Sequence, residues 1–543
     1  MKLHRNRLLP LIALLCATVA HAAEPVVDFV VVQADTLIGL SNNVLVSPAA
    51  WREVARLNRL RDPNRIVPGQ VLKIPTRLLR ANPVDARLVS AVGDVRIGDA
   101  AAAGDAPVAE GQSVQTGPAS SAVIELADGS RVRLPPSSLA QITASRQLGE
   151  RSASAAAPSG WFAGTMRVLR GSVEVVASKV LRAKPLEVVT PTAVVGVRGT
   201  RYRVGLDDEA NSRTHGEVTE GTVRFETTRG NAGADIATGY GAVADASGAA
   251  PSVVKLAPAP DLSALPERFE RPIVRFALPA EAAPLRVQVA SDLAFDKIVV
   301  DQRVAAGAEV RVVDLEDAQW YLRARRVDAQ GIEGFDATRA FVLKARPQPP
   351  AYRTPRADGK QQVGNIEFAW APNAEAPQVR LQVTEDDTFT KIVHEHDAVA
   401  GGTLRADIAA AGVYYWRVAS VRASGDQGPF GDPQRFELRP FPEPPTVGRS
   451  ADGSGLSFKW SGRAQDRQQV ELASDAAFTQ IVAKDELAAA EWILAAPRGG
   501  RYYFRYRSVE PDGYVTPYSE KLIVDVPRDW SLWLLLLPLV VLL

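Results

Sequence analysis

The chain has 543 residues, and at roughly 100–200 residues per domain this length predicts about three to five domains. Its 63 Lys and Arg residues balance 62 Asp and Glu residues, which excludes the basic excess expected of a general nucleic-acid binder. A hydrophobic fraction of 46% is typical of folded domains and not of a disordered chain. We therefore expect a multidomain protein with no nucleic-acid partner.

Residues 1–22 have the pattern of a secretory signal peptide. Basic residues precede an apolar run at 8–20, and Ala20-His21-Ala22 forms an A-x-A cleavage site. Cleavage there would remove Cys16, the single cysteine, so the mature chain would hold neither disulfides nor a cysteine-ligated zinc. Lipid modification of Cys16 is the alternative, although Leu15 stands where a small residue is wanted. A secreted chain without disulfides favours a bacterial periplasm or envelope.

Residues 26–77 predict a small β-α-α-β head. The β-branched and aromatic run at 26–32 is typical of a strand. Asp35 or Thr36 is expected to cap a first helix, and Pro48 to open a second. The expected apolar faces of the two helices comprise Leu37, Ile38 and Leu40, then Trp51, Val54 and Leu57.

The end of the head predicts a closing strand. Asn58 is expected to end the second helix, and Pro68-Gly69 is a turn signal. Val71, Leu72 and Ile74 then alternate as a strand that completes the β-α-α-β order.

These motifs together resemble a LysM domain. They are Asp35-Thr36-Leu37, Trp51 with Leu57-Asn58, and the closing I-x-P-G-Q-x-L-x-I-P at 66–75. The resemblance implies binding of N-acetylglucosamine-containing glycans, usually peptidoglycan, in a shallow groove between two loops. The implied glycan-binding residues are Ala34, Asp35, Thr36, Leu37, Asn64, Arg65, Ile66 and Val67. Ala34 stands where the family commonly has Gly, Asp35 and Thr36 can equally serve as a helix cap, and we interpret Trp51 as a core residue.

Residues 86–259 predict an all-β, solenoid-like region of short strands with glycine corners. A hairpin is expected at 121–134, where two alternating runs flank Asp128-Gly129. Strand pairs of the same kind are expected around two further glycines, at 88–97 with Gly93 and at 166–176 with Gly171.

Motifs in this region resemble a FecR domain. They are AVIEL at 122–126 with Asp128-Gly129, LRGSV at 169–173, TPxA at 190–193, VRGT at 197–200 and EGTV at 220–223. Named members of that family relay an outer-membrane transport signal to an extracytoplasmic sigma factor. They carry a cytoplasmic segment and a membrane helix before the domain, where this chain has a signal peptide and the LysM-like head. The resemblance makes an envelope signalling regulator the alternative function.

Three copies of one pattern follow, with a period of about 90 residues. We place them at 262–346, 347–440 and 441–527, with proline clusters at the joints. Each copy has alternating strands and reaches an aromatic strand, at 320–324, 414–418 and 502–506. This arrangement predicts β-sandwiches and resembles fibronectin type III domains in length, strand order and the placement of Trp and Tyr.

Other motifs do not predict a catalytic or metal site. The segment 196–200 lacks the Gly-Lys-Ser/Thr of a phosphate loop, and Asp207-Asp208-Glu209 lacks EF-hand spacing, so we interpret it as a solvated loop. His394 and His396 share a strand face and could hold a metal, but no third ligand is evident. No cofactor is expected.

The chain ends in a hydrophobic tail at 530–543. As a helix this tail would be about 21 Å long. It would be too short to cross a bilayer, because that takes a helix of roughly 20 residues. Trp530 and Trp533 suit a membrane interface, so we expect a short helix that dips into a membrane. A strand buried in a partner and a sorting tail that is removed are the alternatives.

We therefore predict a non-enzymatic periplasmic protein that binds peptidoglycan through its head. The FecR-like region and the sandwiches would act as scaffold or binding modules for envelope protein partners, and the tail would contact a membrane. A cell-wall hydrolase is disfavoured because no Ser-His-Asp, zinc-protease or paired-carboxylate motif stands out.

Overall fold

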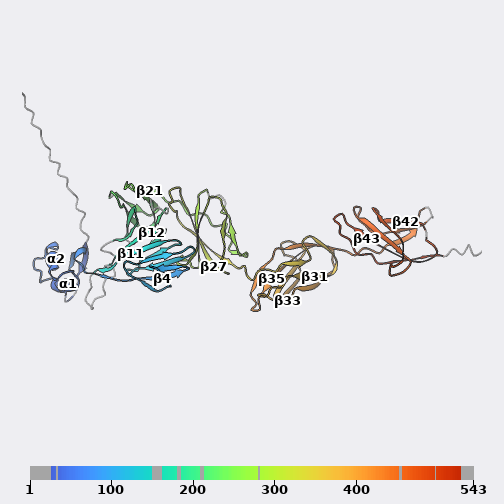
Figure 1. Ribbon diagram of the computed structural model, residues 1–543, viewed down its shortest axis with the longest axis horizontal. Helices are drawn as coiled ribbons and strands as arrows, with labels where there is room; N and C mark the ends of the chain where they lie inside the picture. The colour runs from blue at the N-terminus through green and yellow to red at the C-terminus, as the bar shows by residue number, and fades with distance from the viewer. Residues whose placement is uncertain are drawn as a thin grey trace, which may run out of the picture. The chain divides into compact units, whose positions relative to one another are not determined.

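The computed structural model describes residues 26–31, 33, 35–148, 162–179, 185–197, 199–207, 213–230, 232–278, 282–451, 455–495 and 497–527. This part is mainly β and multidomain, as predicted (Figure 1). The chain divides into two compact units, Met1–Leu343 and Lys344–Leu543. The predicted signal peptide at 1–22 and the predicted membrane-contacting tail at 530–543 lie outside the described residues. No helix among those described is long and apolar enough to span a membrane. The finer domain boundaries stay a prediction.

The head has the predicted β-α-α-β order, with a 3₁₀ turn before the second helix. Strands β1 (Val26–Val30) and β2 (Val71–Pro75) pair antiparallel. Between them lie α1 (Leu37–Asn43), η1 (Pro48–Ala50) and α2 (Trp51–Leu57), and η2 (Thr76–Leu78) follows β2. Trp51 packs against the core of the head, as predicted.

Two predicted core positions of the head are exposed instead. Ile38 is 56% exposed, whereas its neighbours Leu37 and Leu40 are buried. Leu57 is 46% exposed, because at about 100° per residue it lies roughly 240° around the helix from Trp51. Val54 and Ala55 fill the core from α2 in its place.

Asn58 does more than end α2. Its Nδ2 donates to the carbonyl oxygens of Val54 (2.8 Å) and Lys73 (2.7 Å), and its Oδ1 accepts from the backbone N–H of Lys73 (2.6 Å). The amide therefore pairs with β2 as a strand residue would and attaches the helix end to the sheet.

The head continues directly into the next domain. Strand β3 (Ala81–Pro83) pairs with β11 (Leu139–Leu148), and Leu148 at the end of β11 is buried in the core of the head. The shared strand pairing and the shared core give the head two attachments to the sheet beside it.

That sheet belongs to a two-sheet domain. One sheet has the order β21 (Ser252–Lys255), β20 (Tyr240–Asp245), β17 (Arg213–Glu220), β16 (Arg201–Leu206), β13 (Ser172–Val176), β10 (Arg131–Leu134), β9 (Ser121–Glu125), β4 (Ala86–Val92), β7 (Ala106–Val108). The other has β19 (Gly233–Ala237), β18 (Thr222–Thr227), β15 (Ala193–Val197), β14 (Leu186–Val189), β12 (Phe162–Arg170), β11, β8 (Ser113–Thr116), β5 (Val95–Ile97), β6 (Ala100–Ala101).

Both sheets advance along the sequence, which agrees with the predicted solenoid-like architecture. One continuous apolar core fills the space between them, because alternate residues of the strands point inward. The predicted hairpin at 121–134 is confirmed, since β9 pairs with β10.

Glycine corners carry the chain between the two sheets. The pairs expected around Gly93 and Gly171 are wrong, because β4 and β5, like β12 and β13, lie in different sheets. Gly171 has φ of +73°, and a Cβ there would lie 2.6 Å from the Oγ of Ser138 on the neighbouring layer. The same Oγ accepts from the backbone N–H of Ser172 at 3.2 Å. A hairpin turn and a sheet-to-sheet corner share one sequence signature, and only the layer beneath distinguishes them.

The three repeats share one strand plan, with a small sheet and a larger sheet. In the first, β23 (Val274–Phe276) pairs with β26 (Val310–Val312), and the larger sheet is β22 (Arg268–Phe269), β28 (Ala337–Leu343), β27 (Ala318–Arg326), β24 (Leu285–Ala290), β25 (Ile298–Val304).

The second repeat has β29 (Tyr352–Thr354), β31 (Gly364–Trp370) and β34 (Thr403–Ile408) in its small sheet. Its larger sheet is β30 (Gly359–Gln362), β37 (Gln434–Arg439), β35 (Gly412–Val421), β32 (Gln378–Thr384), β33 (Ile392–Ala400), with β36 (Gln427–Phe430) on β35.

The small sheet of the third repeat consists of β38 (Thr446–Arg449), β39 (Gly455–Lys459) and β42 (Glu491–Ala495). Its larger sheet is β41 (Ile481–Leu487), β40 (Arg467–Ala473), β43 (Gly500–Val509), β44 (Leu522–Val526). Aromatic residues fill its core, with Phe458 and Phe504 stacked at 4.3 Å between ring centroids.

We expect Asn58→Ala to lower the stability of the head by about 2 kcal/mol, because three hydrogen bonds at a half-buried site are lost. Hydrogen exchange of the Lys73 amide in the full-length chain measures the change. Asn58→Asp keeps only the acceptor oxygen, so its stability should lie between those of the wild type and Asn58→Ala. Exposed Asn64→Ala is the matched control, and equal protection of Lys73 in the two Ala variants would contradict the proposed role of Asn58.

Candidate functional site

The two loops of the head that the sequence singled out leave the same end of the β1–β2 pair, where Val30 lies opposite Val71. The backbone N–H of Val31 donates to the oxygen of Gln70, and the N–H of Gly69 donates to the oxygen of Val31, both at 2.8 Å. These bonds hold the chain after β1 against the turn before β2. Gly69 has φ of +85° in the Pro68-Gly69 turn, where the N–H of Gln70 donates to the oxygen of Val67.

In the first loop, Thr36 is the helix cap. Its Oγ1 accepts from the N–H of Gly39 at 3.0 Å, so the structure selects Thr36 over Asp35 for this role. Asp35 is half-buried, and Ala34 lies outside the described residues. Leu37 is 2% exposed and belongs to the core, so its side chain supports the loop from below.

In the second loop, the predicted residues alternate between surface and core. Asn64 and Arg65 are exposed, and the N–H of Asn64 donates to Oδ1 of Asp62 at 2.9 Å. Ile66 packs against the core of the head, whereas Val67 is 60% exposed. Exposed Ile38 and Val67 thus add apolar surface to the two loops, and sequence reasoning missed Ile38 because it assigned that residue to the helix core.

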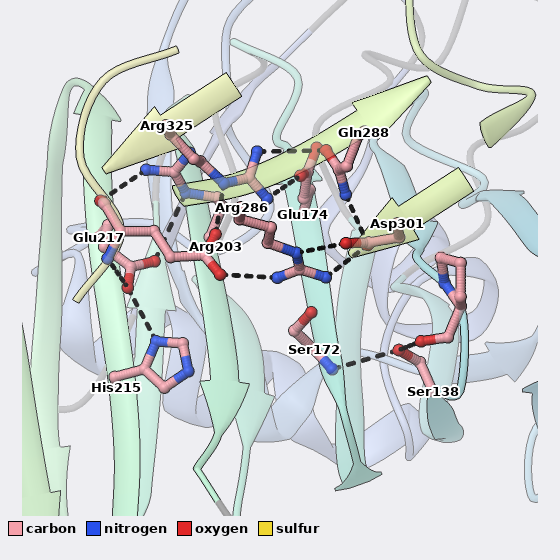
Figure 2. A network of polar contacts seen from close by, with 12 residues as sticks. Ser138, Ser172, Glu174, Arg203, His215, Glu217, Arg286, Gln288, Asp301 and Arg325 are labelled. Carbon is pink, nitrogen blue, oxygen red and sulfur yellow. Dashed lines mark hydrogen bonds and ion pairs between the residues drawn. The ribbon is translucent and has the colours of Figure 1, made fainter. Parts of the chain in front are cut away.

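A second polar cluster joins the two-sheet domain to the first repeat (Figure 2). Arg323 and Arg325 on β27 reach Oε1 of Glu174 on β13, with Nη2–Oε1 distances of 2.8 and 3.2 Å. Arg203 on β16 donates to the backbone oxygens of Glu333 (2.9 Å) and Gly334 (2.7 Å). The other charged members are Glu217, Arg286, Asp301 and Asp336.

The centre of the cluster is buried, and the pKa values of Glu174 and Glu333 are lowered there. The side chains of Arg325 and Glu333 are 1% and 2% exposed and bond to each other, and Glu333 also pairs with Arg286 at 2.7 Å. Burial alone would raise the pKa of Glu174, but the neighbouring arginines outweigh it and hold that pKa well below its usual range. The pKa of Glu333 is lowered by Arg286 and Arg325 against the same opposing effect of burial.

His215 completes the charge balance of this cluster. Its Nδ1 lies 2.8 Å from Oε1 of Glu217, and its Nε2 lies 3.5 Å from Oδ1 of Asp207. Burial lowers its pKa, but Glu217, Glu333 and Asp207 raise it to a net value above the usual 6.5. The cluster named above holds four arginines and five carboxylates, and the raised pKa of His215 favours a fifth positive charge beside Glu217.

Asp207 corrects one prediction from the sequence. Its side chain is 7% exposed and pairs with Arg213 at 2.8 Å, so it is not part of a solvated loop, whereas Asp208 and Glu209 lie outside the described residues. Sequence reasoning missed the whole cluster, because charged residues at alternate positions of a strand normally indicate a solvated face. The only available signal was the pairing of Arg323 with Arg325 on a strand of the first repeat.

The remaining candidate residues do not form a metal centre. His394 and His396 stack with 6.3 Å between ring centroids, and Nε2 of His394 lies 3.0 Å from the backbone oxygen of Asp407. Across the described residues, no group of three or more His, Cys, Asp or Glu side chains is placed to hold a metal. Strand β15 ends at Val197 and β16 begins at Arg201 in the other sheet, so the chain changes sheets here, as expected of a glycine corner.

Comparison with known families assigns two parts of the chain. Residues 29–75 match the LysM domain and residues 112–224 match the FecR protein family. The chain carries a LysM domain followed by a FecR domain. Both are binding or regulatory families and not enzyme families. No curated protein matches the chain.

Solved structures give weaker likenesses. A candidate anti-sigma factor from Parabacteroides distasonis is 12% identical at a TM-score of 0.20, over 26% of this chain and 59% of its own, so this chain spans less than two thirds of its length. Chicken CNTN1 domains FN1–FN3 are 12% identical at a TM-score of 0.21, over 45% of this chain and 90% of that structure. Clostridium thermocellum CbhA fibronectin(III)-like modules are 16% identical at a TM-score of 0.21, over 33% of this chain and 94% of that structure.

We expect Glu333→Gln to lower the free energy of unfolding of the first unit by about 3–5 kcal/mol, because it leaves two buried arginines short of a carboxylate. Hydrogen exchange of β13, β16, β24 and β27 amides in the full-length chain measures this. Glu270→Gln, in the exposed pair with Arg268, is the matched control and should cost less than about 1 kcal/mol. Equal effects would show that the cluster does not hold the two domains together.

The stability of this junction should fall as the pH rises above 6.5. The pKa of His215 is raised in the folded protein, so its contribution is fully present below the unfolded value of 6.5 and is lost as the pH passes the raised folded value. Urea unfolding of the first unit at pH 6, 7, 8 and 9 tests this. His215→Gln should flatten the pH dependence, and a wild-type profile that is flat over this range would contradict the assignment of a charged His215.

Proposed function

We propose that this chain is a non-enzymatic protein of the cell envelope that binds peptidoglycan through the two loops of its LysM domain. The match over residues 29–75 carries the proposal, since LysM modules bind N-acetylglucosamine-containing glycans. The backbone bonds between Val31 and the 69–70 turn support it, because they fix the bases of the two loops beside each other. The binding surface would comprise Thr36 and Asp35 in one loop and residues 64–67 in the other.

The surface chemistry of these loops suits a neutral sugar polymer. Exposed Asn64, Arg65 and Thr36 offer hydrogen-bonding groups, and exposed Ile38 and Val67 offer apolar contact for sugar rings. Sites for small ligands commonly combine apolar surface with a few placed polar groups. The FecR domain and the three repeats would act as scaffold, in the periplasm after removal of residues 1–22, with the 530–543 tail in contact with a membrane.

A second candidate function, regulation of a sigma factor, is supported by the FecR match at 112–224. Deletion of the gene followed by transcript profiling discriminates the two functions. Altered expression of an extracytoplasmic sigma-factor regulon would favour the regulator.

Purified full-length protein should co-sediment with peptidoglycan sacculi, and muramidase digestion of the sacculi should release it. The triple variant Asn64→Ala, Arg65→Ala, Val67→Ala should bind at least about tenfold more weakly, because several hydrogen bonds and an apolar contact are lost. Arg56→Ala on the exposed face of α2 is the control and should bind as wild type. Retention of the triple variant at the wild-type level would refute the assigned loops.

A further inference from the structure

The LysM domain is a basic part of an otherwise balanced chain. Lys and Arg outnumber Asp and Glu by six to three in residues 29–75, whereas the whole chain has 63 against 62. Three of these arginines, Arg59, Arg61 and Arg65, lie in the connection between α2 and β2, and all three are exposed. We call these three residues the loop arginines. The last of them also belongs to the loop at 64–67 that is assigned to the glycan.

The loop arginines have no carboxylate partner in the part of the chain that the structure describes. The acidic side chains nearest in sequence are engaged elsewhere. Glu53 on α2 bonds to Arg77, and Oδ1 of Asp62 accepts from the backbone N–H of Asn64 at 2.9 Å. Exposed cations without a partner attract an anion. A guanidinium suits a carboxylate in particular, because it can donate two parallel hydrogen bonds.

The two exposed arginines of α2 are placed differently. The guanidinium of Arg52 lies over the ring of Trp51, 5.2 Å from its centroid. Arg56 is one helical turn from Glu53, whose pKa is lowered by the hydrogen bond from Arg77 and further by the charge of Arg56. Both cations therefore interact with side chains of their own domain, and this distinguishes them from the loop arginines.

Arg59 occupies a backbone position that normally takes glycine. It follows α2 with φ of +51°. Its N–H donates to the oxygen of Arg56 at 3.1 Å, and the N–H of Leu60 donates to the oxygen of Ala55 at 3.0 Å. These two bonds form a Schellman motif, in which glycine is favoured because a Cβ is strained at positive φ. The helix end alone therefore does not account for an arginine here, and such an outlier points to a role for the side chain.

Peptidoglycan carries anions beside its sugars. Short peptides with free carboxylates are attached along its glycan chain, whereas chitin is a polymer of N-acetylglucosamine without peptides or carboxylates. A glycan chain held at residues 64–67 would bring its peptides to the surface next to these residues. That surface includes Arg59 and Arg61, which precede the glycan loop in the same connection.

We propose that the loop arginines bind the carboxylates of the peptides on peptidoglycan. The LysM domain would then prefer this acidic polymer to a neutral polymer of N-acetylglucosamine. The proposal rests on the proposed glycan binding by the LysM loops, and it adds the class of ligand that they select.

Co-sedimentation of the purified full-length chain with two forms of sacculi tests the proposal. One form is untreated, and in the other the amines are acetylated and the carboxylates are then converted to methylamides. The wild type should bind the untreated form about three- to tenfold more tightly, because exposed ion pairs each contribute a fraction of a kcal/mol. Calorimetry with chitohexaose measures binding of the neutral sugar chain alone.

The variant Arg59→Gln, Arg61→Gln removes two charges outside the assigned glycan loop. It should bind untreated sacculi about three- to tenfold more weakly, and it should bind blocked sacculi and chitohexaose as wild type. The control Arg52→Gln, Arg56→Gln removes the same charge from α2 and should bind all three ligands as wild type. An equal loss of sacculus binding in the control would show a general charge effect and overturn the assignment to the loop.

Arg59→Gly separates the side chain from the backbone. Its head amides should be protected from hydrogen exchange as well as in the wild type or better, because glycine relieves the strain at positive φ. Its binding to untreated sacculi should nevertheless be weaker. A purely structural role of Arg59 would leave sacculus binding unchanged in this variant.

The remaining outcomes separate this proposal from the one on which it rests. Equal binding of both sacculus forms by the wild type, or wild-type sacculus binding by the Arg59→Gln, Arg61→Gln variant, would overturn the peptide contact and leave the glycan site standing. Failure to bind both sacculi and chitohexaose would overturn the glycan site as well. Binding to phosphatidylglycerol vesicles that depends on Arg59 and Arg61, with sacculus binding unchanged, would assign the loop arginines to a membrane instead.

Discussion

The buried arginine–carboxylate cluster between the FecR domain and the first repeat is the interaction on which the first unit depends. Removing ions from water costs several kcal/mol for each, and only close pairing returns this energy. Arg325 and Glu333 are almost fully buried, so every misalignment of the two domains would leave an unpaired charge. The cluster therefore favours one relative orientation. A purely apolar contact would tolerate sliding much more readily.

The same face is open in the other two repeats, and this explains why the first repeat alone is built into the first unit. Ile298 is 1% exposed because Ser121 and the FecR sheet cover it, and Oγ of Ser121 donates to its backbone oxygen at 3.0 Å. The corresponding Ile392 and Ile481 are each 40% exposed. The stacking of an arginine on a phenylalanine nevertheless recurs in all three copies, as Arg323 on Phe295, Arg417 on Phe389 and Arg505 on Phe478.

The first unit is thus one connected body from the LysM domain to the first repeat. Strand β3 and Leu148 attach the LysM domain to the FecR sheet, and the ionic cluster attaches the FecR domain to the first repeat. A ligand held by the LysM loops would therefore be held by the whole unit. In the proposed scaffold role, force on a bound ligand would pass from the LysM domain to the first repeat through hydrogen bonds, packed core and ion pairs.

The sequence by itself determined the elements whose signals are local. Alternation, turn residues and the I-x-P-G-Q-x-L-x-I-P pattern indicated the β-rich class, the LysM domain, the FecR domain and the hairpin at 121–134, because each depends on residues close in the chain. The tertiary structure alone decided that Gly171 is a corner between sheets, that Ile38 faces solvent, and that Arg325 and His215 are buried. The reason is physical: a charged residue on a strand is solvated or buried according to what packs on that face, and here the covering sheet is some 150 residues away in sequence.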